Sequence, residues 1–355
     1  MKHDHILIIR FSALGDVAMT VPIVWSLAQQ YPQLRITMLS RPFARPLFEN
    51  LAPNVNFMEA DLKKEYHGIK GLNSLYRRLV AKQFTHIADL HNVIRSDFLR
   101  IRFNIARYRV EHIDKNRKMR RQLVRQNNKH LEQLPTSFEN YLQVFERLGY
   151  PVTLTFRSIF GDGKGSLMQL PPIFESKEDG EQWIGIAPFA AHEGKVYPPE
   201  QMLDVIRLLV QHHPNARILL FGRGAREEEL FPHWCHEVPQ CINVGLYTET
   251  LRDELILMSH LDVMLSMDSA NMHLASLTHT PVVSVWGATH PYAGFMGYGQ
   301  SKNNIIQLDM PCRPCSIFGN KPCRRNDYAC MRDIKPETII EKINAILSNP
   351  LNSLT

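Results

Sequence analysis

The chain has 355 residues, a length that favours two domains over one, and each half is long enough to bury its own core. A hydrophobic fraction of 44% and a charged fraction of 21% exclude a disordered or fibrous protein. The four consecutive aliphatic residues before Arg10 are too few for a signal peptide and no run reaches transmembrane length, so we expect a cytoplasmic protein with a formal net charge of +6.

The first half of the chain alternates strands with helices. Residues 5–11 form the first predicted strand, and residues 16–31 form a helix with apolar side chains at helical spacing. Further strands are predicted at 35–39, 55–58 and 86–90, and further helices at 43–51, 71–82, 92–104 and 137–148. This alternation predicts a mostly parallel sheet with helices on both faces.

The second half repeats the pattern after a glycine- and proline-rich linker at 151–179. Its predicted strands are 183–189, 216–221, 241–244, 263–267 and 282–286, and its helices are 201–212, 227–236, 250–260, 270–277 and 336–347. The expected fold class is therefore α/β, with two doubly wound Rossmann-like domains at 1–165 and 180–334. We expect the ligand site in a central cleft that the two domains face, at the carboxyl ends of their strands.

Positive charge is concentrated between residues 95 and 129, where twelve Lys or Arg residues stand against three acidic ones. Such a block indicates an anionic partner, namely a phosphorylated glycan or a membrane surface, although a solvated loop has the same composition. The block has no interleaved aromatic residues and no recognition-helix pattern, so we do not expect nucleic acid as the partner.

Asp16 is the first candidate for chemistry. It lies in the first turn of its predicted helix, where the helix dipole favours an ionised carboxylate. The turn before it lacks the G-x-G-x-x-G pattern of nicotinamide and flavin dehydrogenases. An ionised carboxylate in a cleft can accept a proton from an attacking hydroxyl. The alternative is an aspartate that only complements the dipole.

Two turns of the second half carry candidate binding groups. Lys195 stands in a loop before a helix that starts with proline, where its charge can neutralise a phosphate leaving group. Gly222 and Glu227 follow the next strand, in the position from which acids meet ribose hydroxyls in nucleotide-binding folds. A loop lysine is also commonly just solvated, and glutamates at a helix start also suit the helix dipole.

The stretch from Asp268 to His273 joins a strand to a helix. Asp268 and Ser269 end the strand, and Ala270 and His273 lie on the helix. A helix start at the carboxyl end of a strand presents free N–H groups that bind phosphate well. The same residues also fit an ordinary capped helix.

Four cysteines, Cys312, Cys315, Cys323 and Cys330, cluster before the last helix. In a cytosolic chain, clustered thiols suggest a structural zinc site before a disulfide. The spacing is not that of a standard zinc ribbon, so free thiols and redox-dependent disulfides stay open as alternatives.

Taken together, these segments resemble glycosyltransferase family 9, the heptosyltransferases of the lipopolysaccharide inner core. The resemblance covers nearly the whole chain and depends on residues 8–16, 89–96, 194–198, 268–275, 286–291 and 312–331 in this order. It implies a GT-B fold with an N-terminal acceptor domain, a C-terminal domain for a nucleotide sugar, usually ADP-heptose, and a last helix at 335–355 that packs back on the N-terminal domain. It also implies inverting transfer that requires no metal or other cofactor.

The resemblance also assigns roles to residues. Asp16 matches the general base that deprotonates the acceptor hydroxyl, and Lys195 matches the lysine that stabilises the departing diphosphate. The residues around the donor's phosphates and sugar are matched by Asp268, Ser269, Ala270 and His273. These roles agree with the chemistry, because inverting transfer needs one base opposite the leaving group and a cation with helix amides can replace a metal.

We therefore expect an enzyme at the cytoplasmic face of the inner membrane that moves heptose from ADP-heptose to a phosphorylated, lipid-linked core acceptor. One alternative is a family member that uses another nucleotide sugar for another surface glycan, and a second is a non-catalytic homologue that binds nucleotide or glycan. Candidates for contact with acceptor phosphate or anionic lipid, by charge alone, are Arg95, Arg117, Lys118, Arg120 and Arg121.

Overall fold

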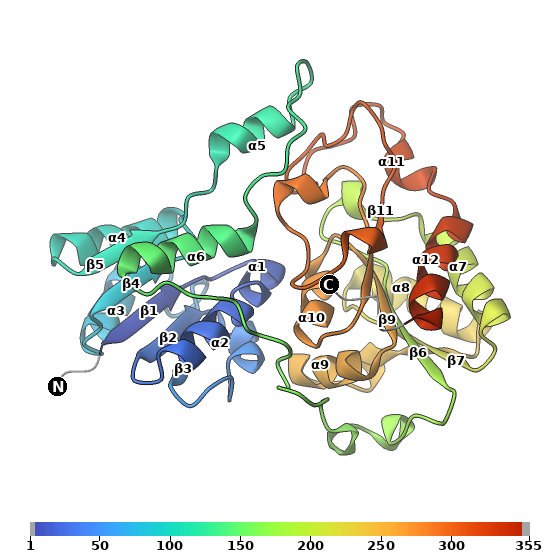
Figure 1. The fold of residues 1–355 in the computed structure, drawn as a ribbon, viewed down its shortest axis with the longest axis horizontal. Helices are drawn as coiled ribbons and strands as arrows, with labels where there is room; N and C mark the ends of the chain where they lie inside the picture. Colours follow the sequence, from blue (N-terminus) through green and yellow to red (C-terminus); the bar gives the residue numbers. More distant parts are fainter. Residues whose placement is uncertain (1–3, 350–355) are drawn as a thin grey trace. The chain divides into compact units, whose positions relative to one another are not determined.

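A computed structural model describes residues 4–349, which divide into two units that each contain one parallel sheet (Figure 1). The first unit contains the residues up to Arg117 and the segment Pro135–Ile159, and the second contains Lys118–Leu134 and the residues from Phe160 onward. The expected boundary at 165 therefore lies at 159, and one segment expected in the first domain belongs to the second.

That exchanged segment belongs to the second unit because of its apolar side chains. Leu123 and Leu134 are buried in a small cluster with Ala293, and Phe295 and Ile317 pack against this cluster. The partners of the two leucines come late in the chain, so the local sequence gave no sign of the packing.

The sheet of the first unit has the strand order β3-β2-β1-β4-β5, and all its pairings are parallel. Its strands are β1 (His5–Ile9), β2 (Arg35–Ser40), β3 (Val55–Glu59), β4 (His86–Asp89) and β5 (Arg109–His112). Its helices are α1 (Leu14–Ala18), α2 (Val21–Gln30), η1 (Pro42–Leu47), α3 (Gly68–Val80), α4 (Ile94–Ile105) and α6 (Ser137–Leu148). This arrangement confirms the predicted parallel sheet.

Local chemistry explains where these helices begin and end. The helix predicted at 16–31 is two helices in the structure, because Pro22 has no N–H with which to continue the first one. Helix α6 has the predicted bounds. Thr136 and Glu139 form a capping box at its start, and Gly149 ends it with a φ of 91°. The stretch predicted at 43–51 is the shorter 3-10 helix η1, which contains Pro46.

The sheet of the second unit has the order β11-β10-β9-β6-β7-β8, again with parallel pairings. Its strands are β6 (Gln182–Ala187), β7 (Ala216–Leu220), β8 (Cys241–Asn243), β9 (Val263–Met267), β10 (Val282–Val285) and β11 (Ile305–Ile306). Its α-helices are α7 (Pro199–His212), α8 (Ala225–Glu237), α9 (Leu251–His260), α10 (Ala270–Leu277), α11 (Ala329–Arg332) and α12 (Pro336–Ser348), and α5 (Arg117–Leu123) begins at the last residue of the first unit.

Short 3-10 helices complete the second unit. They are η2 (Leu167–Gln169), η3 (Pro172–Phe174), η4 (Glu193–Lys195), η5 (Val244–Leu246), η6 (Pro291–Ala293) and η7 (Lys302–Asn304). Across the residues that the structure describes, no helix combines the length and the apolar character that a membrane span needs.

The last helix packs differently from the expectation. From the sequence we expect it on the first domain, but the buried face of α12 packs in the core of the second unit, beside α7 (Figure 1). Ile339, Ile343 and Ile346 of this face are almost fully buried there. Their helical spacing gives α12 one apolar stripe, and that stripe is already covered within its own unit.

Each sheet has one point where the strand order reverses. In the first unit this point lies between β1 and β4, and in the second it lies between β6 and β9. The loops that leave the carboxyl ends of such strands diverge, and ligands bind in the crevice between them. The turns after these four strands are therefore the places to look for a site.

Candidate functional site

In the first unit, the turns after β1 and β4 meet at the reversal point. The backbone N–H of Phe11 donates to His91 Nδ1 at 3.4 Å, and Arg10 Nη1 donates to the Leu90 carbonyl at 2.7 Å. On the other turn, Asp89 accepts from the backbone N–H groups of His91 and Asn92, both at 2.9 Å, which holds the start of the loop before α4.

Contacts with Arg10 and with the backbone of Ala13 hold Asp16 at this point. Its Oδ2 lies 2.8 Å from Arg10 Nη2, and the same oxygen accepts from the Ala13 N–H at 3.1 Å. Arg10 is 6% exposed, and although burial opposes its charge, nearby Tyr141 and Asp16 raise the pKa of the guanidinium. The carboxylate of Asp16 is thus fixed by a buried permanent cation and reaches the surface, which suits a group that must accept a proton from outside.

Two buried titratable groups lie behind Asp16. Burial, reinforced by the charge of Arg10, lowers the pKa of His91 to about 3, so its imidazole is neutral at physiological pH. Burial also raises the pKa of Asp89, which is fully buried and whose Oδ2 lies 3.9 Å from Arg100 Nη1. Neither group is exposed enough to replace Asp16 as the base.

The lowered pKa of His91 predicts a loss of stability in acid. The unfolded chain, in which histidine titrates near its ordinary value of 6.5, binds a proton that the folded chain does not bind until about pH 3. Stability should therefore fall as the pH falls below about 6.5, by on the order of 1 kcal/mol for each pH unit from this group.

Urea unfolding of wild type and His91→Gln at pH 7 and pH 5 checks this. The variant should lose less stability than wild type between the two pH values, and His67→Gln, at an exposed position, should behave as wild type. Equal pH dependence of wild type and His91→Gln would show that His91 is not the cause.

In the second unit, the turns after β6 and β9 bring Lys195 and Asp268 together. Lys195 Nζ lies 2.9 Å from Asp268 Oδ2 and donates to the Asp268 carbonyl at 3.1 Å. Thr289, in the turn after β10, donates from its hydroxyl to the same carboxylate oxygen at 2.8 Å. Asp268 is 4% exposed and serves as the fixed anchor, whereas the ammonium of Lys195 can exchange this partner for a ligand phosphate.

The helix that follows Asp268 begins two residues after this anchor. Helix α10 starts at Ala270, and the Ser269 side chain makes no capping hydrogen bond to it; its hydroxyl lies 3.2 Å from the Ser266 hydroxyl instead. The first-turn amides of α10 therefore have no partner from the Ser269 side chain, and Ser269 and Ala270 are only half-buried. Lys195 and these amides form one positively polarised corner, which fits phosphate. His273 lies one turn further along α10, buried at 7% exposure.

Gly222 and Glu227 also lie together. Gly222 has a φ of +138°, and a methyl group built on it would stand 2.8 Å from Glu227 Oε1. The carboxylate of Glu227 is thus folded over the glycine turn after β7, unlike the exposed Glu228 and Glu229. An ion pair of 2.7 Å between Arg226 and Glu193 ties the start of α8 to the turn of Lys195.

Sequence reasoning missed three residues that build these turns. Arg10 and Thr289 hold the two carboxylates. Arg313 is 4% exposed and donates to the carbonyls of Gly287, Leu308 and Thr289, so it fixes the turn from which Thr289 reaches Asp268. Thr289 and Arg313 each have partners more than 20 residues away in sequence, and Arg10 meets Asp16 across a tight turn. Only the fold shows these contacts.

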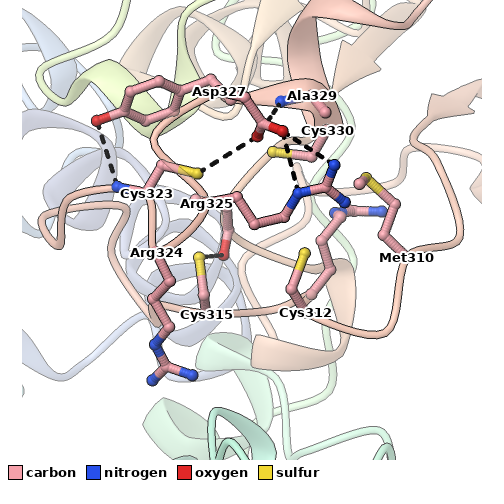
Figure 2. A pocket seen from close by; sticks show the side chains of 12 residues that line it. Met310, Cys312, Cys315, Cys323, Arg324, Arg325, Asp327, Ala329 and Cys330 are labelled. Carbon is pink, nitrogen blue, oxygen red and sulfur yellow. Dashed lines mark hydrogen bonds and ion pairs between the residues drawn. The ribbon is translucent and has the colours of Figure 1, made fainter.

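The four clustered cysteines line one pocket with Arg313, Arg324 and Asp327 (Figure 2). All six cysteines of the chain are free thiols. Among the described residues, no group of three or more His, Cys, Asp or Glu side chains has an arrangement that could hold a metal ion. Of the alternatives that the sequence leaves open, the described residues show free thiols and neither the zinc site nor the disulfides.

Burial explains the protonated state of two of these thiols. It raises the pKa of Cys330 to about 11 and raises that of Cys315 as well, so both are protonated at neutral pH. The Cys323 thiol and the Arg325 guanidinium both contact Asp327, as Figure 2 shows. The loop that carries these cysteines, residues 312–330, also packs against Lys195, since a methyl group on Gly319 would stand 2.7 Å from Cγ of that lysine. This loop therefore positions the methylene chain of Lys195.

The predicted basic residues fall in both units. Arg95 is exposed on α4 of the first unit, and Arg117, Lys118 and Arg121 are exposed on α5. Arg120 differs from them, because its guanidinium lies over the rings of Phe295 and Phe318 at 5.1 and 5.8 Å. We therefore assign Arg120 to the packing of α5 on the second unit rather than to an open binding surface.

Comparison with known proteins shows which family this chain belongs to. The family model of glycosyltransferase family 9 (heptosyltransferase) matches residues 72–324. Lipooligosaccharide heptosyltransferase 2 of Campylobacter jejuni is 26% identical over 179 residues, which cover 48% of this chain and 53% of that protein. The lipopolysaccharide core heptosyltransferase OpsX of Haemophilus influenzae is 24% identical over 80% of this chain and 79% of its own.

The match to the Campylobacter relative thus spans about half of that protein's length. Among solved structures, the ADP-heptose lipopolysaccharide heptosyltransferase II of E. coli has 19% identity and a TM-score of 0.66, with 98% of this chain and 99% of that chain covered. This likeness shows that the two parallel sheets are those of a GT-B fold. Since the family match extends over well more than half of the sequence, the chain belongs to glycosyltransferase family 9, the heptosyltransferase family.

Proposed function

We propose that this protein transfers heptose from ADP-heptose to a lipopolysaccharide core acceptor, with inversion at the transferred carbon and without a metal. The observation that carries the proposal is the corner formed by Lys195 and the start of α10, with Asp268 as the anchor of the lysine, because an ammonium and free helix amides are groups that bind a diphosphate. The E. coli structure with the same fold is described as an ADP-heptose heptosyltransferase, which favours that donor over other nucleotide sugars.

In the proposed reaction, each residue has a separate task. Asp16 accepts the proton of the acceptor hydroxyl as that oxygen attacks the anomeric carbon of the heptose, and the bond from this carbon to the diphosphate oxygen breaks. Lys195 and the α10 amides take up the negative charge that develops on the departing ADP. Arg10 keeps the Asp16 carboxylate in place, and the Glu227 carboxylate at Gly222 is available to the ribose hydroxyls.

The identity of the donor can be tested by ligand stabilisation. A tight ligand of the folded state raises the apparent stability, by about 2.7 kcal/mol when its concentration is 100 times Kd. We expect ADP-heptose to raise the Tm more than the UDP, GDP and CMP sugars of a panel, and ADP alone to give part of the effect. A larger rise in Tm with another nucleotide sugar would contradict ADP-heptose as the donor and would identify that sugar nucleotide instead.

Chelation should leave transfer intact. Lys195 and the helix amides supply the positive charge that a divalent ion supplies in other transferases, so we expect the rate of heptose transfer to be unchanged in EDTA. A loss of rate in EDTA that returns with added Mg²⁺ would show that an ion completes the diphosphate site.

The proposed place of action is the cytoplasmic face of the inner membrane, where a lipid-linked phosphorylated acceptor is accessible. Reversal of charge on α5, as in Lys118→Glu with Arg121→Glu, should impair transfer to the lipid-linked acceptor and leave hydrolysis of the donor unchanged. The matched control, Lys63→Glu with Lys64→Glu, changes the same charge on the first unit and should transfer at the wild-type rate. If both double variants keep full transfer to the lipid-linked acceptor, α5 is only a solvated helix.

A further inference from the structure

Helix α4 exposes an apolar stripe that the fold does not use. Ile94, Ile101 and Ile105 are 87%, 55% and 74% exposed. Their spacing of seven and four residues places them on one face of the helix. The opposite face already contributes Leu99 and Phe103, which are fully buried, to the core of the first unit.

Such a helix is unusual on a protein surface. A surface helix normally has one apolar face toward the core and a polar face toward water. Helix α4 is apolar on both faces, and its outer isoleucines extend from its first residue to its last. Single exposed apolar residues need no explanation, but a continuous stripe marks a contact surface.

The charges beside the stripe indicate what this surface contacts. Arg95 and Arg102 are exposed, and their spacing of seven residues makes them follow one flank of the stripe. Arg107, just beyond the end of α4, is exposed as well. In the part of the chain that the structure describes, none of the three is in an ion pair. The acidic residue of the helix, Asp97, is neutralised by Arg100 at 2.9 Å.

One of these arginines is held in place. The Arg102 guanidinium lies 4.7 Å from the ring centroid of Tyr76 on α3, so its position on the flank does not depend on the charge it meets. The helix thus presents three isoleucines beside a positive flank whose arginines are not paired with a carboxylate among the described residues.

We propose that this face of α4 docks on an anionic lipid surface. The isoleucines enter the boundary between headgroups and acyl chains, and Arg95, Arg102 and Arg107 meet the phosphates of the headgroups. A second copy of this chain would bring the same positive flank, whereas anionic headgroups bring the opposite charge, so charge favours the membrane. The proposal deepens the proposed function, on which it rests for a lipid-linked acceptor.

Co-sedimentation with vesicles tests the proposal on the whole chain. Wild type should pellet with vesicles that contain phosphatidylglycerol and much less with vesicles of phosphatidylcholine alone. The variant Ile94→Ser/Ile101→Ser/Ile105→Ser should lose at least about tenfold in partitioning to the anionic vesicles, because the apolar insertion is removed. These positions are exposed, so the variant should keep the Tm of wild type.

Two further variants define the contact. Arg102→Gln with Arg107→Gln should reduce the preference for anionic over neutral vesicles. The control Met168→Ser with Leu246→Ser removes side chains that are 91% and 75% exposed in the second unit, and it should bind vesicles as wild type does. Equal vesicle binding by the isoleucine variant and wild type would overturn the proposal. A change from dimer to monomer in the isoleucine variant without vesicles, with vesicle binding unchanged, would overturn it in favour of self-association.

The same variants separate this proposal from the proposed function. Transfer to a deacylated, water-soluble core acceptor needs no membrane, so the isoleucine variant should perform it at the wild-type rate. If wild type fails to transfer heptose to this acceptor while α4-dependent vesicle binding persists, the proposed reaction is wrong and the lipid-binding surface stands. If transfer is normal and vesicle binding does not depend on α4, only the docking surface is wrong.

Discussion

Replacement of Asp16 by alanine should abolish heptose transfer while binding of the donor survives. Without the carboxylate, no group at this turn can accept the proton of the acceptor hydroxyl, because His91 and Asp89 behind it are buried. Removal of a general base commonly costs 10² to 10⁴ in rate, so we expect the rate to fall by roughly a thousandfold. Transfer is measured by mass spectrometry of the acceptor, and donor binding by calorimetry with ADP.

Asp16→Asn separates the chemistry from the structure. The amide keeps the size of the side chain and an oxygen that can accept from the Ala13 N–H, but it cannot act as a base. It should be as inactive as Asp16→Ala and should still fold, with a stability below that of wild type because the buried Arg10 loses the carboxylate charge opposite it. Asp61→Asn, on the surface of the same unit, should retain full activity. Near-normal turnover in Asp16→Asn would remove the assignment of the base.

Lys195→Ala should weaken ADP binding, and it should slow transfer by a larger factor than it weakens binding. The ammonium supplies positive charge both to the bound diphosphate and, more strongly, to the departing one, so we expect a fall of about 10² to 10³ in the transfer rate. Calorimetry with ADP and initial rates with saturating donor measure the two effects. Lys302→Ala, on the surface of the second unit, should change neither.

The ion pair with Asp268 complicates this variant, because Asp268 would remain buried without its cation. The double variant Lys195→Ala/Asp268→Asn removes both charges and should recover stability but not ADP affinity. Recovery of ADP affinity in the double variant would mean that Lys195 only stabilises the turn. Unchanged ADP affinity in Lys195→Ala itself would remove the lysine from the donor site.

The sequence predicted the regular elements well where local chemistry determines them. Strand β9 and helix α10 have the predicted bounds, because the apolar run ends at the polar pair Asp268 and Ser269 and a proline follows the helix at position 281. Strand β5 was missed because it is a short edge strand with two charged residues, Arg109 and Glu111, in which no apolar pattern can be seen. Strand β11 has only two residues and gives no periodic signal.

The long-range arrangement lay beyond the reach of the sequence. The basic residues near 120 were visible, but the packing of Leu123 and Leu134 on Phe295 and Ile317 depends on residues far along the chain. The apolar face of α12 was visible too, and its partner α7 was not. Helical periodicity indicates that one face of a helix is buried, but it does not indicate which element covers that face.

The candidate site also contains some residues that could be predicted from the sequence and some contacts that could not. Asp16, Lys195 and Asp268 could be named from the turns in which they stand, and their chemical roles came from the resemblance to the family. Their partners could not be named, because Lys195 and Asp268 are 73 residues apart and Thr289 is 21 residues from Asp268. Lys195 and Asp268 meet because β6 and β9 both end at the reversal point of one sheet, and Thr289 follows β10, the strand beside β9; both are properties of the topology.

Mass spectrometry of the core oligosaccharide from a strain that lacks this protein tests the central claim most directly. We predict a core that ends one heptose short, that wild-type protein restores and that Asp16→Asn does not. Incubation of the truncated core with purified protein and ADP-heptose should add this heptose in vitro. An unchanged core in the deletion strain, or a core that lacks a different sugar, would contradict the assignment of this chain as an ADP-heptose-dependent transferase of the core.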